Sequence, residues 1–342
     1  MSNKPERYVD PMTPRTRWFL YRAIRFVAMG FLVLTIIFIL PRIMPGDPIE
    51  NLLGEASVGL NEEAKESLLA HYKLDRPIWE QYISFLQSIF TFDFGYSITR
   101  SMDVGSMISR RLPWTIALTL PPIIIGSFLA ICVSVYCGLH RGKLLDKILT
   151  TLSIYIQTIP GFLIAMIAIL IFSFKLGIFP LGHLNSGEYS GVEKVIDTIY
   201  HLTLPILVLT ISVFLGKFLI LRNSVIQISG ENYIFVAKSK GLTEDQVMMR
   251  HVLRNIMPIF LSMLIMNIGF MITGALMVEL VFSLQGMGTM LYDAISAQDY
   301  PAIQGAFIIV VLWVLLMNIV AEFLYGVADP RVGDNVDKRA GL

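Results

Sequence analysis

Charged residues are scarce in this chain. Of its 342 residues, 15% are charged and 55% are hydrophobic, whereas soluble globular domains carry about 25% charged residues. This composition excludes a soluble domain. The hydrophobic residues gather in runs of about 20, and a helix of that length spans the hydrocarbon core of a bilayer. The sequence therefore predicts an integral membrane protein.

Excess charge of one sign and a cysteine framework are also missing. The chain has 27 Lys and Arg against 26 Asp and Glu, so its charge gives no general basis for nucleic-acid binding. The two cysteines, Cys132 and Cys137, lie five residues apart in one hydrophobic run and would point to different faces of a helix. We expect no disulfide scaffold and interpret both cysteines as small core residues.

Common catalytic motifs are missing too. The chain contains no Gly-x4-Gly-Lys-Ser/Thr phosphate loop, no His-Glu-x-x-His and no Gly-x-Ser-x-Gly. Its five histidines show no metal-ligand spacing: His71, His140, His183, His201 and His251. An intramembrane enzyme finds little support, and we expect no catalytic residue, no metal and no cofactor in this chain. A passive channel is a second alternative.

Six hydrophobic segments are long enough to cross a membrane. They cover residues 23–41, 114–138, 148–174, 201–221, 257–282 and 302–326. Four prolines inside these segments are predicted kinks or helix starts: Pro121, Pro122, Pro160 and Pro205. The sequence predicts an all-α membrane protein with six transmembrane helices.

The short loops differ in positive charge. Lys and Arg gather in residues 1–22 and in the loops after the second and fourth segments, whereas residues 283–301 contain neither. By the positive-inside rule, the tails 1–22 and 327–342 are both predicted to lie in the cytoplasm. Residues 42–113 are too long for this rule and are predicted to form a helical insertion outside the membrane.

The insertion contains two predicted helices. Asn61 is followed by two glutamates, which is typical of a helix start. Pro77 suits the first position of a second helix, whose apolar residues recur at steps of three and four up to Phe90. We expect this second helix to lie along the outer membrane surface or to pack on the spanning helices.

The most informative segment is the predicted cytoplasmic loop 222–256. Gly241 stands where a helix would end in the left-handed conformation, and Thr243 with Gln246 forms a capping box for a new helix. The loop is therefore predicted to form a helix, a glycine turn and a short helix.

The short helix of this loop has two distinct sides. Arg250 and Arg254 form a basic strip. The apolar side consists of Val247, Met248, His251 and Val252. Such a helix fits either a membrane surface, where its cations meet anionic lipid, or a docking element for a cytosolic partner. A passive channel would not need the docking element.

The spacing of this loop resembles a known family. Ala237-x3-Gly241, followed after sixteen residues by Pro258, is similar to the cytoplasmic EAA loop of binding-protein-dependent ABC importer permeases. Further motifs resemble the peptide/nickel permeases of the B-subunit type, found in oligopeptide and dipeptide importers. These motifs are Pro45-Gly-Asp-Pro48, Leu74-Asp-Arg-Pro77, Phe92-Asp-Phe-Gly95, Arg111-Leu-Pro113, Glu279-x2-Phe282-Ser283 with Gly286-x-Gly288, Asp299-Tyr-Pro301 and Asp329-Pro-Arg331. Two positions depart from the family pattern: Phe235-Val236 stands in place of Glu-Ala, and Gln285 in place of a proline.

The resemblance implies a type I ABC importer permease fold, with the ABC transmembrane domain at about residues 110–326 and the extracellular helical insertion before it. The subunit would pair with a second, similar permease in a prokaryotic cell membrane. Each permease would seat its short helix on a cytosolic ATPase subunit, which binds ATP and Mg²⁺, and a solute-binding protein would deliver substrate from outside. The implied coupling residues are Ala237, Gly241, Thr243, Glu244, Val247, Met248, Arg250, His251 and Arg254.

Three ionisable residues interrupt the hydrophobic segments: Lys217, Glu279 and Glu322. Each can reach a membrane interface, so each is interpreted either as a snorkelling side chain or structural ion pair, or as a pathway residue, with Glu279 the best pathway candidate. The resemblance implies short peptides as cargo, with nickel or a metal chelate as the alternative. The spans lack clustered His, Cys or carboxylate ligands, which slightly favours peptides.

Overall fold

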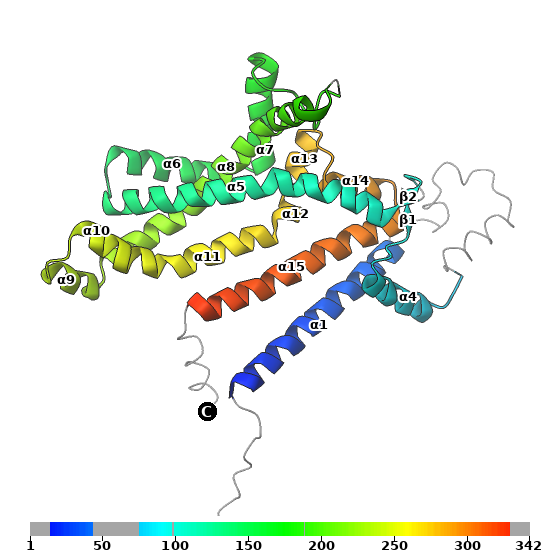
Figure 1. Cartoon of the computed structure of the whole chain (residues 1–342), viewed down its shortest axis with the longest axis horizontal. Coiled ribbons are helices and arrows are strands. Elements are labelled where there is room, and N and C mark those ends of the chain that lie inside the picture. Colours follow the sequence, from blue (N-terminus) through cyan, green and yellow to red (C-terminus); the bar gives the residue numbers. More distant parts are fainter. Residues whose placement is uncertain (1–13, 44–74, 98, 188, 329–342) are drawn as a thin grey trace, which may run out of the picture.

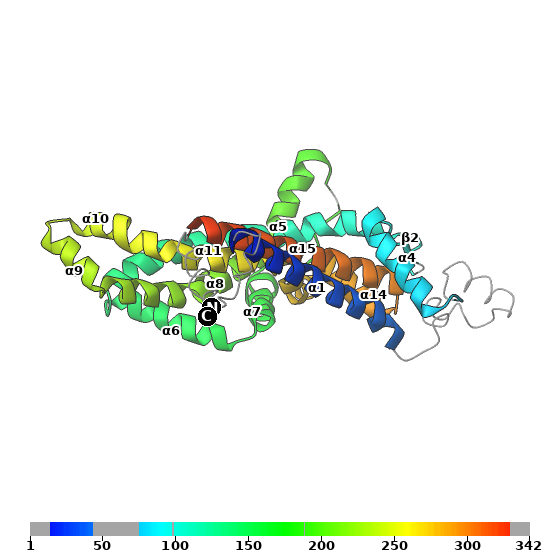
Figure 2. The same cartoon turned by 90° about the horizontal axis from the view of Figure 1, so that it is seen from below.

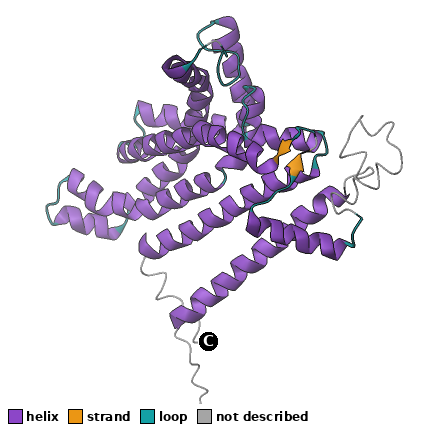
Figure 3. Ribbon diagram, turned by 45° about the vertical axis from the view of Figure 1, so that its right-hand side comes forward, coloured by secondary structure: helices purple, strands orange, loops and turns teal. Residues whose placement is uncertain are grey.

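The structure is a computed structural model that describes residues 14–43, 75–97, 99–187 and 189–328. Within these ranges the chain is almost entirely helical, with one small strand pair (Figure 3). The helix predicted from Asn61, most of both predicted tails and the Glu322 side chain lie outside the described part.

The described elements differ widely in length. The long helices are α1 (Pro14–Ile43), α5 (Val104–Leu139), α8 (Gly191–Ser229), α11 (Leu253–Gly269) and α15 (Tyr300–Ala328). The shorter helices are α4 (Ile78–Thr91), α6 (Leu144–Thr158), α7 (Gly161–Ala168), η2 (Ile169–Lys175), α9 (Asn232–Ser239), α10 (Glu244–Val247), η3 (Met248–Val252), α12 (Met271–Gly274), α13 (Leu276–Val281) and α14 (Met287–Ser296). The strands β1 (Tyr96–Ser97) and β2 (Met102–Asp103) pair antiparallel.

The helices form a bundle with two distinct ends. α1 packs on α15, α15 on α11, α11 on α5, α5 on α8 and α8 on α6. Figures 1 and 2 both show α9 and α10 at one end of the long axis, and α4 with the β1–β2 hairpin at the other. The loop around Gly241, between α9 and α10, and the β1–β2 hairpin therefore lie at opposite ends of the molecule.

Among the described residues, five helices are long and apolar enough to cross a membrane, or six if one bent pair is a single span. The bent pair consists of α6 and the continuous run of α7 and η2, which meet at 104°. The predicted span 148–174 therefore contains two helices rather than one. Pro160 explains the break, because it disfavours helical geometry at the preceding residue, and Ile159 has extended φ and ψ of −94° and 125°.

The predicted boundaries around residues 221 and 257 also change. α8 continues to Ser229, so residues 222–229 belong to a helix. α10, η3 and α11 follow one another without a break from Glu244 to Gly269, so the predicted short helix runs directly into the next span. The predicted span 257–282 is interrupted instead near Gly269, after which the short helices α12 and α13 follow. Glycine is a poor helix former, which is consistent with this position.

The insertion helix α4 packs on the spanning helix α1. Its Tyr82 hydroxyl lies 2.7 Å from Thr35 Oγ1, and the rings of Phe38 and Phe85 lie 5.5 Å apart. Pro77 is the residue immediately before α4 rather than its first residue. Of the two locations predicted for this helix, the structure has the one packed on a spanning helix.

Small residues allow α5 and α8 to approach closely. Gly126, Ala130, Ser134 and Gly138 follow one another at steps of four along α5, and all four are buried. A Cβ atom at Gly126 would lie 2.9 Å from the carbonyl oxygen of Thr210, and a Cβ atom at Gly138 would overlap the Val225 side chain. The two helices are thus fixed together up to the end of the bundle that carries α9 and α10.

The structure contradicts the expected burial of one cysteine and the expected interface position of Lys217. Cys132 is exposed, and only Cys137 is a buried core residue. Lys217 lies twelve residues before the end of α8 rather than about four, because α8 is longer than predicted. Its side chain is 3% exposed and donates a hydrogen bond to Ser127 Oγ on α5, so it does not snorkel to an interface.

Candidate functional site

The Gly241 loop, residues 230–256, has the predicted local structure. Helix α9 ends at Ser239, and Gly241 follows with φ of +82°, a left-handed value that glycine adopts without strain. The capping box is present: Gln246 N donates to Thr243 Oγ1 at 3.3 Å, and Thr243 N donates to Gln246 Oε1 at 3.2 Å. The turn and the cap together set the direction in which α10 leaves α9.

The inner side of the loop is anchored by apolar contacts. Ile234, Ala237, Val247 and Val252 are buried in one cluster with residues of α5 and α8. The members from these two helices are Ala130, Ile131, Val135, Leu221 and Val225. Of the predicted coupling residues, Ala237 and Val247 therefore hold the loop on the bundle and do not form its outer surface.

The outer side of the loop carries most of the remaining predicted residues. Gly241, Thr243, Glu244, Arg250 and Arg254 are exposed. Met248 and His251 are half-buried. The loop thus presents a polar and basic surface away from the bundle, in addition to the apolar contacts that anchor it.

Exposed apolar side chains on this loop were missed by the sequence analysis. Phe235 is 75% exposed and Met249 is 59% exposed, and Val236 is exposed beside Phe235. The signal was present in the sequence: once Ile234 and Ala237, three residues apart, are placed on the inner side, Phe235 and Val236 must face outward. A surface that combines exposed apolar residues with cations suits protein docking better than solvent.

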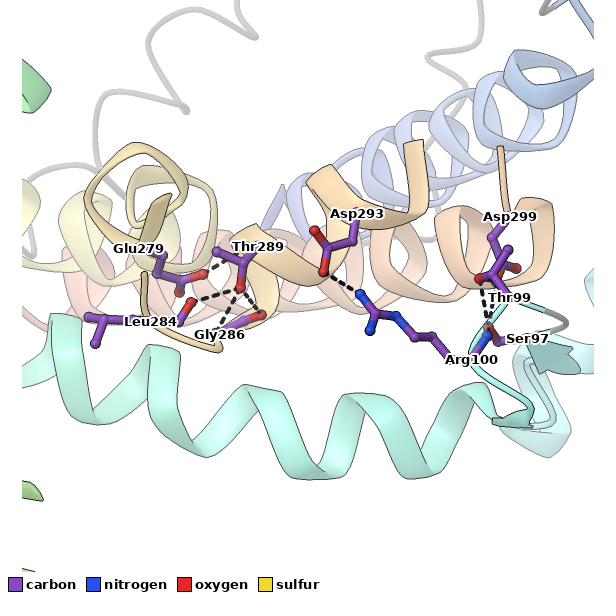
Figure 4. A network of polar contacts seen from close by, with 9 residues as sticks. All are labelled: Ser97, Thr99, Arg100, Glu279, Leu284, Gly286, Thr289, Asp293 and Asp299. Atoms are coloured by element: carbon purple, nitrogen blue, oxygen red, sulfur yellow. Dashed lines mark hydrogen bonds and ion pairs between the residues drawn. The ribbon is translucent and has the colours of Figure 1, made fainter. Parts of the chain in front are cut away.

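A second polar site lies away from the Gly241 loop, around Glu279 on α13 (Figures 1 and 4). The Glu279 side chain is 1% exposed. Its carboxylate accepts hydrogen bonds from Thr115 Oγ1 at 2.6 Å and from Thr289 N at 2.9 Å, and Thr115 Oγ1 accepts one from Met287 N at 2.7 Å. A Cβ atom at Gly286 would overlap this carboxylate.

This Glu279 network joins α5, α13 and α14 inside the chain. The glutamate therefore faces the packing between three helices. Its hydrogen-bond partners are hydroxyl and backbone groups, and Arg111 acts on it through charge without a direct bond. Its position gives no support to the hypothesis that it lines a pathway. Among the described residues, no group of three or more His, Cys, Asp or Glu side chains is placed to hold a metal ion.

An ion pair fixes the end of the bundle next to the Gly241 loop. Arg222 of α8 donates from two nitrogens to the two carboxylate oxygens of Asp146, each at 2.7 Å. Gly142 N also donates to Asp146, at 2.8 Å. This bidentate pair, whose carboxylate is 3% exposed, ties the start of α6 to α8 a few residues before the loop begins.

Comparisons with known proteins identify the family and several relatives of this chain. Residues 123–334 match the family described as binding-protein-dependent transport system inner membrane component. The chain is 29% identical to the dipeptide transport system permease protein DppB of Escherichia coli (strain K12), over 92% of this chain and 98% of that protein. It is 30% identical to DppB of Bacillus subtilis (strain 168), over 91% and 97%. It is also 30% identical to the di/tripeptide transport system permease protein DppB of Pseudomonas aeruginosa (strain UCBPP-PA14), over 88% and 94%.

Proposed function

The chain belongs to the family of binding-protein-dependent transport system inner membrane components, and on this premise we propose that it is the permease subunit of an ATP-driven importer of short peptides. It is a multi-pass inner membrane protein. The peptide cargo is supported by the names of its relatives, which are dipeptide, di/tripeptide and peptide permeases. Nickel, the alternative cargo, is not favoured by any of these names.

The observation that carries the proposal is the geometry of the Gly241 loop. A capped helix leaves a left-handed glycine at the end of the bundle and presents exposed Met249 and Arg250. Docking of this surface in a groove of a cytosolic ATPase would couple the chain to ATP hydrolysis, for which its own sequence has no phosphate loop. The loop then lies in the cytoplasm, together with both termini.

The packing of the loop suggests how movement would be transmitted. Ile234 and Val247 anchor it to α5 and α8, and residues 244–269 form one continuous helical run. When ATP-driven closure of two ATPase subunits moves the loop, α5, α8 and α11 would follow as rigid bodies, because their packed contacts change only by discrete steps. The bundle, paired with a second permease, would then turn between inward-open and outward-open states.

The test is uptake of labelled dipeptides and tripeptides by cells that lack this gene and by the same cells with the gene restored. We expect ATP-dependent peptide uptake to return with the gene, and nickel uptake to be equal in both strains. Loss of nickel uptake in the deletion strain, with peptide uptake unchanged, would overturn the peptide cargo. Uptake that persists after ATP depletion would overturn the importer.

A further inference from the structure

A small cavity lies at the end of the bundle opposite the Gly241 loop. Its volume is about 240 Å³, and it is lined by the start of α5, the segment after β1, α14 and the start of α15. Pockets for drug-sized ligands measure about 300–1,000 Å³. The cavity therefore suits one end of a small molecule rather than a whole one.

Both carboxylates that line the cavity are already engaged. Asp293 forms an ion pair with Arg100 at 2.8 Å (Figure 4). Asp299 accepts hydrogen bonds from Ser97 Oγ at 2.5 Å, Thr99 Oγ1 at 2.6 Å and Ala302 N at 3.2 Å. The acceptor oxygens of both carboxylates are therefore bonded to groups of the protein itself.

Arg111 supplies the remaining charge of the cavity wall. It lies on α5 one turn after Met107 and one turn before Thr115, so it faces α14. The side chain is half-buried, and within the described ranges its guanidinium makes no hydrogen bond or ion pair. A guanidinium offers a planar fork of donors that matches a carboxylate in two parallel hydrogen bonds.

We infer that Arg111 binds the carboxylate at the C-terminal end of a peptide as the peptide enters the permease. The inference rests on the proposed function and names the substrate group that this site recognises. Met107, Met290 and Ala294 form an apolar wall beside Arg111, and this wall contacts the last side chain of the peptide without selecting its identity. Asp293 and Asp299 make their hydrogen bonds to other groups, so Asp293 and Glu279 act on the Arg111 guanidinium only through their charge. The N–H donors of Arg111 stay available to the substrate.

The experiment compares uptake of a labelled dipeptide with uptake of its C-terminal amide, in proteoliposomes that contain the complete importer and its binding protein. The variants are Arg111→Gln, Arg111→Lys and, as the matched control, Arg110→Gln. Arg110 is the exposed neighbour of Arg111 and does not line the cavity. The same binding protein serves every variant, so its own preference for the free acid cancels from the comparison.

We expect Arg111→Gln to lower uptake of the dipeptide acid by about tenfold at low concentration, which is the effect of losing one charge-assisted interaction. Uptake of the amide stays unchanged in this variant. Arg111→Lys keeps part of the acid uptake, because it keeps the charge. Arg110→Gln behaves as wild type with both peptides.

Other outcomes overturn the inference. Equal loss of acid and amide uptake in Arg111→Gln would indicate a structural role for this residue. Weaker binding of the substrate-free binding protein to Arg111→Gln would identify an acidic side chain of that protein as the occupant. If the wild-type importer takes up neither peptide, the proposed function itself fails, and the inference falls with it.

Discussion

Replacing Gly241 with valine isolates the role of the glycine turn. Gly241 has φ of +82°, and a Cβ atom built there has no neighbour within 4 Å. A larger side chain therefore meets open space, and the only cost is the left-handed backbone, about 1–2 kcal/mol for a residue with a Cβ. The chain can relieve this strain by changing φ, and that change would alter the direction of α10.

A second glycine provides a matched control. Gly187 has φ of +80°, and a Cβ atom there also has no neighbour within 4 Å. Gly187→Val thus introduces the same backbone strain in the loop before α8, away from the docking surface. Gly241→Asn is a milder change at the first site, because asparagine tolerates the left-handed region.

The assay measures peptide uptake and substrate-stimulated ATP hydrolysis in the purified importer, normalised to the amount of permease in the membrane. A strain of 1.4 kcal/mol corresponds to a factor of about ten, so we expect Gly241→Val to lower both activities by about tenfold. Gly187→Val should keep both, and Gly241→Asn should be intermediate. If Gly241→Val and Gly187→Val have the same activities, the reasoning about the turn is refuted.

Three further predictions follow from packing, charge and topology. Gly286→Ala places a methyl group on the Glu279 carboxylate and should lower the free energy of unfolding by about 1–3 kcal/mol. At Gly274 an added Cβ atom meets no neighbour within 4 Å, so Gly274→Ala should leave the free energy of unfolding unchanged. Thermal denaturation in detergent measures the stability of both variants. Asp146→Asn removes the buried carboxylate that pairs with Arg222, whose side chain is 13% exposed, and should cost about 1–3 kcal/mol. Adding Arg222→Gln should cost little more; additive losses would show that the two residues are not coupled. In a chain without Cys132 and Cys137, a cysteine at Lys194 should react with an impermeant reagent in intact cells and one at Asp245 should not; the reverse pattern would contradict the orientation.

The sequence predicted the Gly241 loop because its signals are local. A glycine at a helix end, and Thr243 paired with Gln246, are complete within six residues, and the structure has the left-handed turn and both bonds of the capping box. The resemblance of several further motifs to a known family then predicted an ABC importer permease, and the family match confirms a binding-protein-dependent permease. The functional roles assigned to the loop residues remain predictions.

The Glu279 network could not be predicted, because its parts are distant in the sequence. Thr115 and Glu279 are separated by 164 positions, and only the packing of α5 against α13 and α14 brings them together. Hydropathy alone likewise gave one span for residues 148–174, since both halves are apolar and the angle between them depends on the geometry at Ile159 and Pro160. The inner position of Ala237 and Val247 also depends on tertiary contacts with α5 and α8.

Site-specific cross-linking tests the central claim most directly, namely that the Gly241 loop docks on an ATPase. Met249, which is 59% exposed, is replaced with cysteine on the docking surface. Val192 at the start of α8, which is 76% exposed, is replaced as the control, and both changes are made in a chain without native cysteines. A photoactivatable probe on each cysteine is then irradiated in membranes that contain the assembled importer. The probe at 249 should cross-link to the ATPase subunit, and the probe at 192 should not. Cross-linking of the 249 probe to lipid alone would contradict the claim.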